Sequence, residues 1–124
     1  MLNELQVEIF ELMRQEIRYY SVDQIAELLS SDTETITTAV SGLVEMGILI
    51  PQDGEFIFDV QKEIETIAQI CAFNRMRHSD ISFLKRNKEE AVEIFESILA
   101  ENDKTKDFFT KAHLSCIQEL LKQI

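Results

Sequence analysis

Apolar residues return every three or four positions over the first twenty residues of the chain, with no glycine or proline among them. This spacing is typical of a helix that buries one face. The sequence therefore predicts a long first helix, whose apolar face is formed by Leu2, Leu5, Ile9, Leu12, Met13, Ile17 and Tyr20.

Two further helices are predicted next, because a capping pattern precedes each of them. Ser21 and Gln24 have the spacing of a capping box, in which two side chains satisfy the first amides of a helix. Ser31 and Glu34 repeat that spacing after a short turn. Gly47 can take the left-handed conformation that ends a helix. The pattern indicates a helix-turn-helix whose third helix buries Ile36, Ala39, Val40 and Leu43.

The pattern then changes from helical to strand-like. Ile48–Ile50 and Glu55–Val60 are rich in β-branched and aromatic residues, and Pro51–Gly54 separates them. An Asp-Gly pair between two such runs favours a β-hairpin. The expected fold of residues 1–60 is mainly α, a winged helix-turn-helix of three helices with a hairpin wing.

The residues Ile25-Ala26-Glu27-Leu28-Leu29, Thr35-Ile36, Ala39-Val40 and Leu43-Val44-Glu45-Met46-Gly47-Ile48-Leu49 carry a family likeness. In their order and spacing, the chain resembles the winged-helix superfamily of bacterial transcriptional regulators, the group that includes the multiple-antibiotic-resistance type, over about residues 2–60. The resemblance implies that the third helix and the wing face a partner, normally the major groove and backbone of DNA. The partner-facing positions would be Glu34, Thr37, Thr38, Ser41 and Glu45, with Gln52 and Asp53 at the wing tip.

Charge argues against the usual partner. No lysine or arginine lies between Tyr19 and Gln61, whereas that stretch holds eight acids: Asp23, Glu27, Asp32, Glu34, Glu45, Asp53, Glu55 and Asp59. The whole chain carries a formal charge of -11. Proteins that bind DNA draw most of their baseline affinity from Lys and Arg contacts to phosphate. We therefore expect a non-enzymatic regulator or adaptor that binds a protein with a basic or neutral surface; the alternative is a DNA-binding transcriptional regulator.

Residues 61–124 are expected to form a helical extension for dimerisation or partner binding. A helix over residues 62 to about 79 has two apolar flanks, so it should contact both the first helix and another copy of the chain in a homodimer. Two more helices are predicted on either side of Asn102–Thr105. Their apolar positions are Ala91, Val92, Phe95, Ile98 and Leu99, then Phe109, Ala112, Cys116, Ile117, Leu120 and Leu121.

One segment of this extension is basic. Five cations and one acid, Asp80, fall within 14 positions, which leaves a local charge of plus four. The cations are Arg75, Arg77, Lys85, Arg86 and Lys88, called the basic island below. One interpretation is a solvated helix junction, in which neighbouring acids offset the positive charges. The other is a contact site for an acidic protein, a phosphorylated protein or a nucleic acid. In the second case it would also serve the DNA-binding alternative.

Metal binding and catalysis find little support. Of the two His/Cys pairs, only His113 and Cys116 have a spacing that could share an ion, whereas Cys71 and His78 lie about two helical turns apart. Buried, reduced thiols are expected, with no metal and no cofactor. Neither a glycine-rich phosphate loop nor a serine elbow is present, so no enzyme is predicted.

Gly42 inside the third helix costs about 1 kcal/mol relative to alanine, which predicts a close approach of the first helix there. The N-terminal residues lack the pattern of a signal peptide, and no apolar run is long enough to span a membrane, so we expect a cytoplasmic protein without a membrane partner.

Overall fold

The computed structural model describes residues 2–70, 78–105 and 111–124. The chain folds as two compact units, residues 2–63 and residues 64–124. Most described residues are helical, and a small antiparallel sheet of three strands belongs to the first unit.

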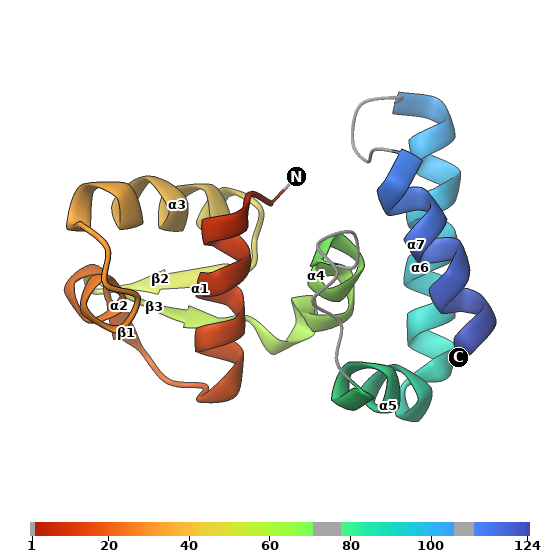
Figure 1. Ribbon diagram of the computed structural model, residues 1–124, viewed down its shortest axis with the longest axis horizontal. Coiled ribbons are helices and arrows are strands. Elements are labelled where there is room, and N and C mark those ends of the chain that lie inside the picture. The colour runs from red at the N-terminus through yellow and green to blue at the C-terminus, as the bar shows by residue number, and fades with distance from the viewer. Residues whose placement is uncertain (1, 71–77, 106–110) are drawn as a thin grey trace. The chain divides into compact units, whose positions relative to one another are not determined.

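The first unit combines three helices with three strands and a 3₁₀ turn (Figure 1). The sheet has the order β1-β3-β2, so β3 is central and pairs with both neighbours in antiparallel register. Its elements are α1 (Glu4–Gln15), β1 (Tyr20–Ser21), α2 (Val22–Leu28), α3 (Thr33–Glu45), β2 (Leu49–Gln52), β3 (Glu55–Phe58) and the 3₁₀ turn η1 (Val60–Lys62).

The first helix is shorter than the apolar spacing predicts. It ends at Gln15, since Glu16 already has extended backbone angles. Ile17 is 50% exposed, whereas Tyr20 is buried in β1 opposite Phe56. The prediction of a helix through Tyr20 was therefore wrong, because pairing with a distant strand placed Tyr20 in the core without a continuing helix.

The N-terminal cap of α2 is the one predicted from the sequence, whereas the cap of α3 differs from the prediction. The Ser21 hydroxyl accepts from the Gln24 amide, and the Gln24 side chain accepts from the Ser21 amide, which confirms the predicted capping box. At α3, Asp32 takes the cap position that had been assigned to Ser31, and its carboxylate accepts from the Thr35 amide. Aspartate caps a helix as well as serine does. The helix therefore begins one residue later than the sequence pattern predicted.

The core of the first unit lies between the helices and the inner face of the sheet. The Phe10 ring of α1 meets the Phe58 ring of β3 edge to face, with ring centroids 5.3 Å apart. The predicted inner face of α3 is confirmed, because Ile36, Ala39, Val40 and Leu43 are all buried. The predicted close approach at Gly42 is also confirmed, since an added Cβ there would lie 2.5 Å from Gln6 Nε2 of α1.

The hairpin follows the predicted turn chemistry. Gly47 ends the α3 segment with φ 76°, and the turn residues Asp53 and Gly54 have φ 51° and 80°. Two successive residues with positive φ are what a tight two-residue hairpin turn requires. The turn therefore fixes the register in which Gln52 lies opposite Glu55.

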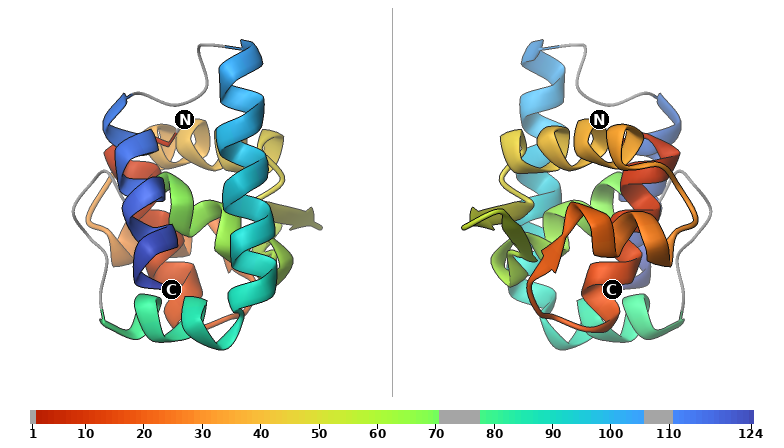
Figure 2. Two further views of the ribbon diagram at one scale, coloured as in Figure 1. Left: turned by 90° about the vertical axis from the view of Figure 1, so that its right-hand side faces the viewer. Right: turned by 90° about the vertical axis from the view of Figure 1, so that its left-hand side faces the viewer.

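The described secondary structure of the second unit is entirely helical. Its buried apolar side chains include Ile64, Ile67, Ala68, Ile70, Leu84, Ala91, Phe95, Ile117 and Leu120. The helices that contribute them are α4 (Glu63–Ile70), α5 (His78–Arg86), α6 (Lys88–Thr105) and α7 (Lys111–Gln123). Helices α6 and α7 run antiparallel and lie side by side (Figures 1 and 2).

The break expected at Asn102–Thr105 was wrong, because α6 continues through Thr105. Of the expected helix over 62–79, residues 63–70 are helical in α4 and residues 78 and 79 are helical in α5. Residues 71–77 and Phe109 lie outside the described residues. Among the described helices, none combines the length and apolar character needed to cross a membrane.

Candidate functional site

The exposed side of α3 carries the candidate residues that the family likeness implied. Glu34, Thr38, Ser41 and Glu45 are spaced by three or four positions and are all exposed, and Thr37 is exposed beside them. Residues at this spacing lie on one face of a helix. The structure thus brings these five residues together on α3.

The threonine hydroxyls on this face are already engaged. Thr37 Oγ1 donates to the Thr33 carbonyl at 2.7 Å, and Thr38 Oγ1 donates to the Glu34 carbonyl at 3.2 Å. Each hydroxyl has a single proton to donate, so neither can donate to a phosphate without breaking its present bond. The face offers methyl groups and acceptor oxygens between two acids.

The N-terminus of α3 is occupied by a carboxylate of the chain itself. Asp32 accepts from the Thr35 amide and the Thr35 hydroxyl, each at 2.8 Å. These two hydrogen bonds hold the pKa of Asp32 below its usual value. Helix N-termini attract anions because their first amides lack intrahelical partners. Here Asp32 fills that role, and it was not among the predicted site residues, although the Asp-x-x-Thr spacing could have indicated it.

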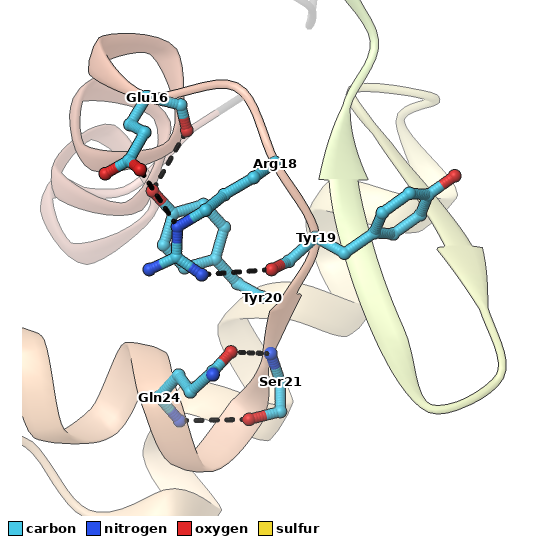
Figure 3. A network of polar contacts seen from close by, with 6 residues as sticks. All are labelled: Glu16, Arg18, Tyr19, Tyr20, Ser21 and Gln24. Atoms are coloured by element: carbon cyan, nitrogen blue, oxygen red, sulfur yellow. Dashed lines mark hydrogen bonds and ion pairs between the residues drawn. The ribbon is translucent and has the colours of Figure 1, made fainter.

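The hairpin positions lie apart from α3 along the chain and are held by different contacts. Asp53 is exposed at the turn, and Gln52 accepts a 2.7 Å hydrogen bond from the Tyr19 hydroxyl. Tyr19 precedes β1, and its ring is turned toward the hairpin strands (Figure 3). The Gln52 side chain is therefore held by Tyr19, which was not among the predicted site residues.

A compact network fixes the segment from which Tyr19 extends (Figure 3). The Arg18 guanidinium lies 3.9 Å from the centroid of the Tyr20 ring, and its Nη1 donates to the Tyr19 carbonyl at 3.2 Å. The Tyr20 hydroxyl donates to the Glu16 carbonyl at 2.9 Å. Glu16 caps the end of α1, so this bond satisfies a carbonyl that the helix leaves open.

The described part of the basic island lies at a helix junction. Lys85 and Arg86 form the last turn of α5, and Lys88 begins α6; all three are exposed. Cations at the C-terminus of one helix and acids such as Glu89 in the first turn of the next suit the two helix dipoles. This placement favours the interpretation of the basic island as a solvated helix junction. Arg75 and Arg77 lie outside the described residues.

Among the described residues, no three His, Cys, Asp or Glu side chains gather as they would around a metal ion. Cys116 of α7 is half-buried and has a free thiol. Cys71 lies outside the described residues.

Comparison of the chain with protein-family models, with curated proteins and with solved structures found no match. The assignment of a function therefore depends on the geometry and charge of this chain alone.

Proposed function

We propose that residues 2–63 form an acidic winged helix-turn-helix that acts without catalysis, as a regulator or adaptor that binds a protein with a basic or neutral surface. The order of helix, strand, two helices and hairpin supports the fold. The antiparallel sheet β1-β3-β2 and the short connection between α2 and α3 support it further.

One observation carries the choice of a protein partner over DNA. The Asp32 carboxylate caps α3 where a DNA phosphate would meet the helix amides of a DNA reader. Asp32 is ionised at neutral pH, and the hydrogen bonds from Thr35, which lower its pKa further, favour the charged form. Since no lysine or arginine lies between residues 20 and 60, nothing on this stretch offsets the repulsion between Asp32 and a phosphate.

The proposal is tested first with DNA. The purified full chain is titrated into labelled random duplex and into duplex from its own upstream region, starting at about 50 mM salt, where phosphate contacts are strongest. We expect no binding to either duplex. Tight, salt-sensitive and sequence-preferring binding would instead identify a DNA reader and refute the protein-adaptor proposal.

A second arm measures attraction for a basic protein surface, with a helical Lys/Ser peptide as the probe. We expect weak binding that falls as salt rises, because the exposed acids of α3, Glu34 and Glu45, supply the attraction. Glu34→Lys should weaken this binding. Glu96→Lys changes an exposed residue of α6 by the same charge and should leave it nearly unchanged. Equal losses of peptide affinity in both variants would show that binding depends only on the net charge of the chain.

A further inference from the structure

The outer face of the sheet presents three neighbouring apolar side chains, called the outer patch below. Ile50 of β2 and Ile57 of β3 lie directly opposite each other, next to the pair Leu49 and Phe58, which is buried. Successive strand residues point to opposite faces. Ile50 and Ile57 therefore share the face that is turned away from the core, and Ile50 is 45% exposed.

Tyr19 completes the outer patch. The next residue, Tyr20, is buried opposite Phe56, so Tyr19 lies on the outer side, where it is 41% exposed. Its hydroxyl bonds Gln52 on β2, the far strand of the sheet, so the side chain reaches across β3 (Figure 3). An exposed aromatic side chain that is held in place loses little conformational freedom when a partner covers it.

The free edge of β2 is poorly suited to another strand. In a hairpin with a two-residue turn, the pair next to the turn, Gln52 and Glu55, is hydrogen-bonded. The backbone nitrogen of the preceding residue then points away from β3, along the open edge. That residue is Pro51, which has no N–H to donate. A partner is therefore better placed to cover the face than to extend the sheet, and a helix is the element that commonly covers a sheet face.

Charge indicates the chemistry of that helix. Glu55 lies opposite Gln52 on the outer side of the hairpin, and Asp53 is exposed at the turn next to it. The nearest cations in the sequence are Arg18, which is stacked on Tyr20, and Lys62. We propose that the outer patch, Tyr19, Ile50 and Ile57, binds an amphipathic helix of a partner protein, whose apolar stripe is flanked by lysines or arginines. This inference rests on the proposed function and names the surface and the partner for it.

The experiment uses the full chain and three helical peptides of about 18 residues, long enough for an apolar stripe of several turns. The first peptide has a leucine stripe with lysines elsewhere, the second replaces its leucines with serine, and the third replaces its lysines with glutamate. Affinity is measured by calorimetry, and the site is mapped by amide chemical shifts. We expect the Leu/Lys peptide to bind at least tenfold more tightly than either other peptide and to shift amides of β1, β2 and β3.

Variants locate the contact. Ile50→Ser should lower the affinity for the Leu/Lys peptide by about tenfold, as expected when an apolar contact at the centre of an interface is lost. Ile50→Thr keeps a β-branched side chain and serves as a second variant that preserves the strand. Leu28→Ser removes a 54% exposed apolar side chain from α2, outside the sheet, and should have no effect.

Two results would overturn the inference in different ways. If the Leu/Lys and Lys/Ser peptides bind equally, the outer patch is not a docking site, whereas the acidic adaptor function stands. If neither basic peptide binds, the proposed function fails together with the inference. Equal losses of affinity for the Leu/Lys peptide in the Ile50→Ser and Leu28→Ser variants would also show that the outer patch is not the binding surface.

Discussion

Gln6 occupies the space that a side chain at Gly42 would need. Gln6 Nε2 donates to the Ala39 carbonyl of α3 at 3.2 Å, and Gln6 Oε1 accepts from the Asn3 amide at 3.0 Å. Gln6 therefore caps α1 and joins it to α3 at the same time. A Cβ on Gly42 would lie 2.5 Å from Gln6 Nε2, so the absence of a side chain is what admits this contact.

Gly42→Ala should destabilise the protein although alanine is the better helix former. Alanine gains about 1 kcal/mol of helix propensity. Displacing the buried Gln6 amide loses its hydrogen bond to Ala39, which costs about 1–3 kcal/mol. We expect urea denaturation to show a net loss of about 1 kcal/mol. Ser41→Ala, at an exposed position one residue earlier, is the control and should be neutral or stabilising.

The sign of that effect should reverse when Gln6 is removed. In a Gln6→Ala background the clash is absent, so Gly42→Ala should stabilise the protein by about 0.5–1 kcal/mol. A double-mutant cycle measured by the same denaturation compares the two backgrounds. Stabilisation by Gly42→Ala in both backgrounds would contradict the role assigned to Gln6.

Asp32 gives the unfolding free energy a specific pH dependence. Its pKa in the folded chain is lowered from the ordinary 3.8 by hydrogen bonds from Thr35. A group with a depressed folded pKa stabilises the fold above its unfolded pKa, and the stabilisation is lost as pH falls through the folded value. Asp32→Ala should therefore be less stable than the parent at neutral pH, and the difference should shrink below pH 3.8.

Thermal unfolding of parent and variant at a series of pH values measures this difference. Asp32→Asn is the matched control, because asparagine also caps helices but carries no charge. It should retain more stability than Asp32→Ala at neutral pH. A difference between parent and Asp32→Ala that stays constant with pH would show that the carboxylate charge does not stabilise α3.

Two adjacent tyrosines allow the same chemical change to be compared at a buried and an exposed position. Tyr20→Phe removes the hydroxyl that donates to Glu16 from a side chain that is 1% exposed. We expect a loss of about 1 kcal/mol, because the Glu16 carbonyl is left without this donor. Tyr19→Phe removes an exposed hydroxyl and should cost under about 0.5 kcal/mol. Chemical denaturation that gave equal losses would contradict the importance of the Tyr20 bond.

The local features of the first unit could be read from the sequence because neighbouring residues determine them. The capping box of Ser21 and Gln24 depends on side chains three positions apart. The Asp53-Gly54 turn depends on which residues tolerate positive φ. The buried side of α3 follows from the helical period. The excess of acids over residues 20–60 was also evident, because charge follows directly from the residue types.

The tertiary structure decided what depends on partners distant in the sequence. The apolar spacing of Ile17 and Tyr20 fitted a continuing helix, but β-pairing of Tyr20 with Phe56 placed it in a strand. The outer patch was missed because Tyr19, Ile50 and Ile57 become neighbours only through the strand register. The sequence determined the charge of the first unit and most of its local conformations. Long-range pairing determined where α1 stops and which apolar side chains remain on the surface.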